Sequence, residues 1–150
     1  MLITNADFKD LKEILKLQYL AYQSEAKLHN NFMIQPLMET LEELTKEYEN
    51  GILLKAIDDN NVIIGSIRGY MENNTLFIGK LMVHPKHQGN GIGSQLLLAI
   101  EQCYPECRYE LFTSEKSTQN LQFYEIRCYR RYAEKLVTPG LKLIYLEKNV

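Results

Sequence analysis

The middle of the chain carries the glycine-rich stretch His84-Pro85-Lys86-His87-Gln88-Gly89-Asn90-Gly91-Ile92-Gly93. An apolar segment, residues 75–83, precedes it, and an apolar segment with helical spacing, residues 91–102, follows it. The first turn of a helix has unpaired N–H groups and the positive end of the helix dipole, and both suit a phosphate. Glycines let the backbone approach such an anion closely. The stretch therefore predicts a pyrophosphate-binding loop at the beginning of a helix.

Three kinds of phosphate-binding loop contain a glycine-rich turn, and two of them conflict with this sequence. A P-loop ends in Gly-Lys-Ser or Gly-Lys-Thr, whereas this chain has Gly93-Ser94-Gln95. A dinucleotide-binding fingerprint needs a third glycine where Ser94 stands, although Glu110 lies where a ribose-binding acid would be expected. A dinucleotide-binding fold also needs parallel strands and a longer chain than 150 residues.

Helical and strand-like spacing alternate along the rest of the chain. Apolar residues recur every three or four positions after Asp7, which can cap a helix reaching about Tyr19, and again from Pro36 to about residue 50. The stretch 21–31 between these helices is polar and aromatic and has no clear period. Two further helices are predicted at residues 91–102 and 117–127. Alternation with a period of two predicts strands at residues 1–4, 52–57, 62–71, 75–83, 108–113, 132–137 and 141–146.

The predicted elements follow the order βααβββαβαββ. Turn-forming residues at 58–61 and 72–74 join three strands into an antiparallel meander, and Thr138-Pro139-Gly140 joins the last two strands into a hairpin. No repeat or linker interrupts the series. The predicted fold class is therefore α/β with a mixed sheet, in a single domain that covers residues 1–150.

Composition and charge argue against several classes of protein. The chain is 45% hydrophobic and 24% charged, its net charge is −2, and its longest apolar runs are too short to span a bilayer. We therefore expect a cytoplasmic protein with no membrane and no nucleic-acid partner. The one basic cluster could hold RNA or a nucleotide phosphate, but it is interpreted as a solvated strand edge; it consists of Arg127, Arg130 and Arg131. The cysteines form neither a disulfide nor a zinc pattern, so no metal site is expected; they are Cys103, Cys107 and Cys128.

Two motifs in this chain resemble those of the GNAT acetyltransferase superfamily. The first is the acetyl-CoA loop of the family, Gln/Arg-x-x-Gly-x-Gly/Ala after a strand that ends in Val-x-Pro. It stands here as Val83-His84-Pro85 followed by Gln88, Gly91 and Gly93. The second is Asn120-Leu121-Gln122-Phe123-Tyr124, which resembles the segment of the family that carries an asparagine and a tyrosine on one helix. The order of elements matches the family fold over essentially the whole chain.

The resemblance implies an N-acetyltransferase that takes an acetyl group from acetyl-CoA. In such an enzyme the backbone of Met82 and Val83 would hold the pantetheine arm, and Asn120 would contact it. Tyr124 would protonate the departing thiolate, although an amphipathic helix can also carry such a tyrosine simply as part of the core. The loop amides would take the pyrophosphate, and they belong to Gln88, Gly89, Asn90, Gly91, Ile92, Gly93 and Ser94.

The general base is the least defined part of this site. Some members of the family use a glutamate on the strand at 75–83, but this strand contains no carboxylate. Its Lys80 is interpreted as an outward-facing charge. Three other side chains are candidates for the general base, although a structural or solvent-exposed role is favoured for each: Glu25, His29 and His84. Ordered water is a further alternative. The helix at 117–127 also departs from the family, because Cys128 occupies a position that is usually glycine.

The acceptor is expected to be a primary amine, and the sequence does not name it. In this family the loop between the first two helices selects the acceptor, and here it contains Tyr19, Tyr22, Glu25, His29, Phe32 and Met33. Aromatics with one or two acids suit a small-molecule amine. A protein or peptide acetyltransferase and a non-catalytic acyl-CoA sensor are the alternatives. Pairing into a homodimer is possible by analogy with the family.

Overall fold

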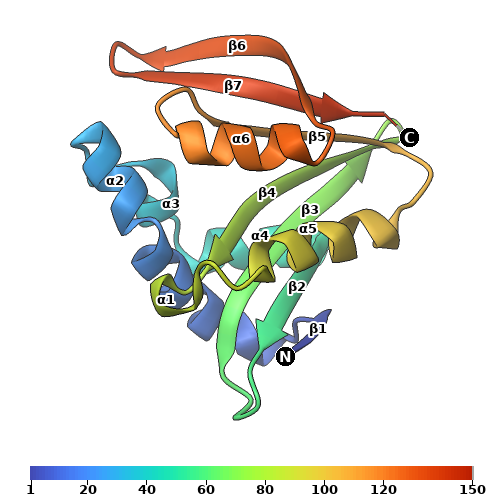
Figure 1. Ribbon diagram of the computed structural model, residues 1–150. Helices are drawn as coiled ribbons and strands as arrows, with labels where there is room; N and C mark the ends of the chain where they lie inside the picture. The colour runs from blue at the N-terminus through green and yellow to red at the C-terminus, as the bar shows by residue number, and fades with distance from the viewer. Residues whose placement is uncertain (150) are drawn as a thin grey trace.

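Residues 1–149, which a computed structural model describes, form one seven-stranded mixed sheet with helices on both faces (Figure 1). The strands are β1 (Leu2–Asn5), β2 (Ile52–Ile57), β3 (Ile63–Glu72), β4 (Thr75–Val83), β5 (Arg108–Ser114), β6 (Arg130–Thr138) and β7 (Leu141–Lys148). The helices are α1 (Leu11–Ala21), α2 (Gln23–His29), α3 (Gln35–Met38), α4 (Leu41–Asn50), α5 (Ile92–Cys103) and α6 (Thr118–Ile126). Short 3₁₀ turns precede α1 and α5. The predicted α/β class with a mixed sheet is confirmed.

Strand order in the sheet is β1-β2-β3-β4-β5-β7-β6. Strands β2 to β4 form the predicted antiparallel meander, β1 adds an antiparallel strand beside β2, and β6 and β7 form the predicted hairpin. The only parallel pairing described joins β4 to β5, and it extends from Thr75 to Phe77 on β4. Beyond Phe77 the two strands separate, so the sheet opens in its middle.

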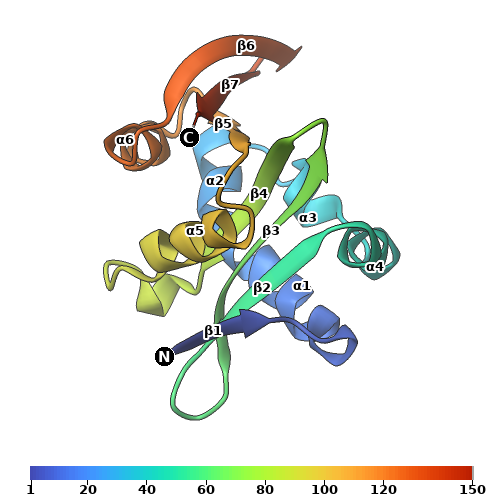
Figure 2. The same cartoon turned by 90° about the vertical axis from the view of Figure 1, so that its right-hand side faces the viewer.

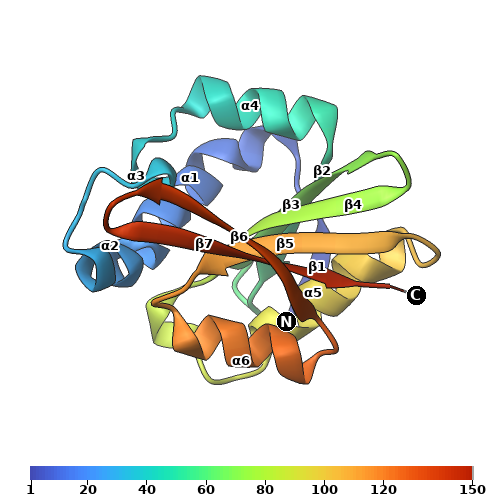
Figure 3. The same ribbon diagram turned by 90° about the horizontal axis from the view of Figure 1, so that it is seen from above.

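The two faces of the sheet are covered by different parts of the chain (Figures 2 and 3). Helices α1 to α4 lie on one face, and α5 and α6 lie on the other. Successive strand residues point to opposite faces, so Leu53 packs under α1 and α4 while Leu54 packs against α5 and its neighbours. Because helices cover both faces, β3 is buried continuously from Ile64 to Arg68.

The helical region before β2 differs from the prediction in two ways. The helix predicted from residue 36 to residue 50 is divided into α3 and α4, because Glu39 is extended and Thr40 caps α4. The Thr40 side chain accepts a hydrogen bond from the Glu43 amide, and Glu43 reaches back to the Thr40 amide, which is a capping box. Helix α2 was not predicted. Ala26 is its only buried residue, so it shows no apolar period.

The C-terminal elements follow the prediction with shifted ends. Strand β6 begins at Arg130 rather than at residue 132, and its residues are all exposed. Arg130 and Arg131 form ion pairs with Glu147 and Glu125 on this surface, as expected for a solvated strand edge. Cys128 has a φ of 74°, so the left-handed turn that usually holds glycine is present with a cysteine in it.

Candidate active site

A cleft of about 870 Å³ lies where β4 and β5 separate. Its walls come from both faces of the sheet: α2 and α4 contribute from one face, and α6 contributes from the other. The cleft therefore passes through the sheet rather than lying on one side of it. Its polar lining includes Tyr22, Glu25, His29, Glu47, Arg68, Lys80, Glu110, Asn120 and Tyr124.

The glycine-rich loop has the geometry of an anion site. Helix α5 begins at Ile92, and Gly91 is its N-cap with a φ of 78°, while Gly89 has a φ of 83°. None of the backbone N–H groups of residues 88–94 donates a hydrogen bond to another group among the described residues. A Cβ atom at Gly89 or Gly91 would meet nothing within 4 Å, so these glycines serve the backbone conformation and leave open space above it. Such a loop fits a pyrophosphate.

Arg127 adds a positive charge beside this loop. Its Nε atom donates a hydrogen bond to Ser94 Oγ at 3.2 Å, and its guanidinium lies 3.8 Å from the centre of the Phe123 ring. The prediction that all three arginines of the basic cluster lie on a strand edge is therefore wrong for Arg127. The guanidinium stands beside the unpaired amides of the first turn of α5.

Beyond Phe77, the edge of β4 that faces β5 has no strand partner. Met82 and Val83 pair with Ser66 and Gly65 of β3 on the opposite edge. The Met82 side chain is buried, and neither Met82 nor Val83 lines the cleft, whereas Gly79, Lys80 and Leu81 of the same strand do. An open strand edge of this kind can bind an amide-containing chain by backbone hydrogen bonds.

Helix α6 directs its tyrosine into the cleft. Tyr124 is buried, and no described residue forms a hydrogen bond with its hydroxyl. Burial raises the pKa of Tyr124, and nearby Tyr22 and Glu25 raise it further, so the hydroxyl keeps its proton. Asn120 lies one turn earlier on the same helix, and its Nδ2 atom donates to Thr113 Oγ1 at 3.3 Å.

Helix α2, on the other face, contributes a second polar group. Ser117 donates a hydrogen bond to Glu25 Oε1 at 2.6 Å, and His29 Nε2 lies 3.6 Å from the same oxygen. Both ring nitrogens of His29 are buried without a hydrogen-bond partner in the described chain. Burial raises the pKa of Tyr22, one turn before Ala26, to about 12. Of the three side chains considered as a general base, Glu25 and His29 line the cleft, whereas His84 does not.

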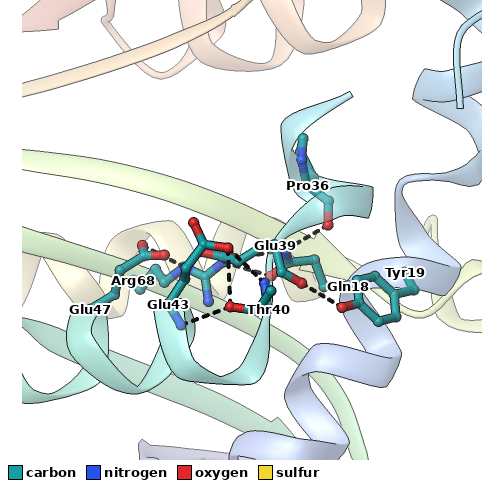
Figure 4. A network of polar contacts seen from close by, with 8 residues as sticks. All are labelled: Gln18, Tyr19, Pro36, Glu39, Thr40, Glu43, Glu47 and Arg68. Carbon is teal, nitrogen blue, oxygen red and sulfur yellow. Dashed lines mark hydrogen bonds and ion pairs between the residues drawn. The ribbon is translucent and has the colours of Figure 1, made fainter. Parts of the chain in front are cut away.

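A buried charge network, which the sequence did not predict, lies on the same face (Figure 4). Arg68 of β3 is 4% exposed, and its Nη2 atom donates to Gln18 Oε1 at 2.6 Å and to Glu39 Oε1 at 2.8 Å. Arg68 Nε lies 3.3 Å from Glu47 Oε2, which is within ion-pair distance but not aligned for a hydrogen bond. Gln18 donates to Glu39 and to the carbonyl oxygen of Pro36, and Tyr19 donates to the Glu39 carbonyl.

The position of Lys80 shows that its interpretation as an outward-facing charge is wrong. Ser66 pairs with Met82 and Arg68 pairs with Gly79, so β4 has an extra residue here, and Lys80 has a φ of 50°. This bulge turns the Lys80 side chain into the cleft rather than outward. Burial lowers the pKa of Lys80, and the charge of Arg68 lowers it further.

Several other residues singled out in the sequence lie outside the cleft. Phe32 and Met33 are exposed and do not line it, so the expected acceptor loop contributes mainly through α2. Cys128 is exposed at the end of α6 and does not line it either. No cluster of three or more metal-ligating side chains occurs among residues 1–149. Within the same residues, every helix is too short or too polar to cross a membrane.

Comparisons with known proteins agree with this architecture. A family model described as the Acetyltransferase (GNAT) family matches residues 9–131. The PaiA N-acetyltransferase of Thermoplasma acidophilum, in complex with coenzyme A, has a similar structure, with a TM-score of 0.81 and 15% identity over 99% of this chain and 98% of that chain. No curated protein matches the sequence significantly.

Two further solved structures share the fold. A ribosomal-protein-alanine N-acetyltransferase from Brucella melitensis has a TM-score of 0.77 and 18% identity, over all of both chains. A spermidine N-acetyltransferase chimera from Vibrio cholerae and hSSAT has a TM-score of 0.75 and 16% identity, over 99% of this chain and 93% of that chain. At these identities the structures show a common fold, and the family model shows kinship over most of the chain. This protein therefore belongs to the GNAT acetyltransferase family.

Proposed function

We propose that this protein transfers the acetyl group of acetyl-CoA to a primary amine while both substrates are bound. The observation that carries the proposal is the cleft through the sheet. It connects the open edge of β4 to a polar chamber on the opposite face, and the helix-start anion loop, which does not itself line the cleft, follows β4 at the start of α5. A donor can enter from the side of α5 and α6, and an acceptor can enter from the side of α1 to α4. The two substrates then meet at the gap between β4 and β5.

The donor side suits a long molecule with a pyrophosphate in its middle. The unpaired amides of residues 88–94 would bind the pyrophosphate, with Arg127 supplying a positive charge beside them. The open edge of β4, which ends at Met82 and Val83, would hold the pantetheine amides by backbone hydrogen bonds, and Asn120 lines the same cleft. When bound, acetyl-CoA supplies a thioester carbon that an amine can attack.

The residues at the gap provide what the reaction needs. A neutral amine nitrogen bonds to the thioester carbon, and the carbon–sulfur bond breaks. Tyr124 would give its proton to the leaving sulfur, since its hydroxyl is protonated and has no competing partner in the described chain. Holding both substrates in one cleft supplies much of the acceleration by itself.

The acceptor is proposed to be a small-molecule amine. The chamber is enclosed by aromatic and aliphatic side chains with acidic groups among them, which suits a cation with an apolar body. These aromatic side chains are Tyr22, Tyr70, Phe77, Phe112 and Tyr145. The N-terminus of a peptide is the alternative acceptor, and a sensor without turnover is the alternative function.

A turnover assay tests the proposal. Release of the free thiol from acetyl-CoA would be followed with spermidine, kanamycin A, alanine amide and a peptide beginning with alanine. We expect turnover with at least one of the first three compounds. Turnover with the peptide alone would support the peptide alternative. Tight coenzyme A binding without turnover on any amine would favour the sensor.

Replacing Gly91 with glutamate is expected to weaken coenzyme A binding at least about 10-fold. The new carboxylate would lie beside the unpaired amides of the loop and repel the pyrophosphate. Isothermal titration calorimetry would measure the dissociation constant. Gly91→Ala is the matched control, because it introduces the same strain at a φ of 78° without the charge and should bind more tightly than Gly91→Glu. Unchanged binding in Gly91→Glu would remove the loop as the phosphate site.

A further inference from the structure

Three glutamates line the cleft, and they differ in how firmly the protein engages them. Glu110 lies at the closed end, where it pairs with Phe77 of β4 and forms an ion pair of 2.8 Å with Arg108. Glu25 accepts a hydrogen bond of 2.6 Å from Ser117. The Glu47 side chain is 43% exposed, and its described contacts leave much of the carboxylate open to the cleft. Glu47 is thus the carboxylate that is most available to a ligand.

Glu47 also lies on the appropriate face of the sheet. It belongs to α4, on the side from which the acceptor would enter, whereas Tyr124 belongs to α6 on the opposite side. The acid must reach the leaving sulfur of the donor and the base must reach the nitrogen of the acceptor, so each is expected on the side from which its own substrate enters. The positions of Tyr124 and Glu47 satisfy this condition.

The network beneath Glu47 holds it in place. Arg68 is anchored by Gln18 and Glu39, and its Nε atom faces Glu47 at 3.3 Å (Figure 4). Arg68 Nη1 is buried and has no partner among the described residues, so the guanidinium is not fully engaged by the protein. A buried donor without a partner is costly, which points to a polar group that arrives with a ligand or with water.

We propose that Glu47 takes the proton from the acceptor ammonium, with Glu39 and Arg68 as its positioning residues; this inference rests on the N-acetyltransferase function proposed above. The ammonium loses one proton to Glu47, which passes it to solvent, and the neutral nitrogen then bonds to the thioester carbon. The nitrogen loses its second proton as the amide forms, and this proton replaces the one that Tyr124 gives to the sulfur. Overall, an ammonium and a thioester become an amide, a thiol and one free proton.

The electrostatics around Glu47 match this role. Partial burial and the neighbouring Glu39 together raise the pKa of Glu47 to about 7, against the opposing charge of Arg68. Lys80 of β4 also faces the pair and lowers both pKa values. Glu39 keeps a lowered pKa, so the pair holds one proton below about pH 7 and loses it as the pH rises through 7, and Glu47 is the member that gains and loses it. A base is most effective when its pKa lies near the working pH.

A pH profile of Glu47→Gln tests the inference. For the wild type we expect kcat/KM for the best acceptor of the amine panel to rise with pH and to level off near pH 7, where Glu47 becomes ionised. In Glu47→Gln we expect kcat/KM at pH 7 to fall about 100-fold. The kcat/KM of this variant should continue to rise up to pH 9 without a break near pH 7, because the variant can use only acceptor amine that is already neutral in solution. The KM for acetyl-CoA should change little.

Two further variants and a titration separate this role from a structural one. Glu49→Gln changes an exposed glutamate of the same helix and should behave as the wild type. Glu47→Asp should keep the break near pH 7 in the profile of kcat/KM, with lower values throughout. Thermal unfolding of each variant would check folding. A Glu47→Gln enzyme that keeps the break and most of its rate would overturn the inference. If the wild type acetylates no amine, the proposed function fails and the inference fails with it. In an active wild type, a Glu47 pKa near 4.5 by ¹³C NMR titration would overturn the inference alone, and one near 7 would support it.

Discussion

Arg68→Met is expected to lower the free energy of unfolding by about 3–5 kcal/mol near pH 7. Arg68 and Glu39 are 4% and 3% exposed, and their ion pair spans 2.8 Å. Methionine fills much of the same volume but leaves the Glu39 carboxylate buried without its cation. Gln18 Oε1 loses its donor as well. Urea denaturation of the wild type and the variant would measure the difference.

The loss should depend on pH in a defined direction. Burial raises the pKa of Glu39, but the hydrogen bond with Glu47 and the charge of Arg68 outweigh burial and hold it below the ordinary value of 4.5. In the wild type the stabilisation by ionised Glu39 is therefore present above pH 4.5 and is lost as the pH falls through the lowered pKa. Without Arg68 the pKa of Glu39 should rise above 4.5, so the variant regains stability on acidification. The difference in the free energy of unfolding between the wild type and Arg68→Met should be larger at pH 8 than at pH 5.

Two controls identify the buried charge as the cause. The double variant Arg68→Met with Glu39→Gln removes the unpaired charge and should be more stable than Arg68→Met alone. Arg131→Met breaks the exposed ion pair between Arg131 of β6 and Glu125 of α6, and it should lower the free energy of unfolding by at most about 1 kcal/mol. Equal losses for Arg68→Met and Arg131→Met would show that the network of Figure 4 contributes little to stability.

The sequence predicted those features that depend on neighbours along the chain. The period of two from residue 62 to residue 83 specified the meander, and the glycines between residues 88 and 94 specified the start of α5. The spacing of Asn120 and Tyr124 placed both on one side of a helix that lines the cleft. Each of these signals is local, so a single sequence contains it.

The Arg68 network could not be predicted because its members are far apart in sequence. Arg68 lies 50 residues from Gln18 and 29 residues from Glu39. Only the fold brings them together, since β3 is covered on both faces and an arginine there has no exposed position. Lys80 was misplaced for a related reason. The bulge changes the alternation of side chains, and the residue with the positive φ is Lys80 itself rather than the preceding Gly79.

Tyr124→Phe is expected to reduce kcat by about 10²- to 10³-fold at saturating substrates while leaving the KM for acetyl-CoA nearly unchanged. The raised pKa of Tyr124 keeps its hydroxyl protonated across the working range, so it can serve as a donor to the leaving sulfur. Because this hydroxyl forms no hydrogen bond with the described residues, its removal should leave the melting temperature nearly unchanged. Pre-steady-state and steady-state thiol release would measure the chemical step.

Tyr129→Phe, at a tyrosine whose ring lies 5.8 Å from that of Tyr124, is expected to lose stability rather than activity. Its hydroxyl donates to Glu101 Oε2 at 2.7 Å in the core, and it does not line the cleft. Removing this buried bond to a carboxylate should cost about 1.5–3 kcal/mol of stability, with kcat preserved in the folded enzyme. A hydroxyl that matters for catalysis and not for stability is placed for a ligand, whereas one with the reverse pattern is placed for the fold. If Tyr124→Phe lost stability and kept its kcat, Tyr124 would be a core residue, and the acid for the thiolate would have to be water.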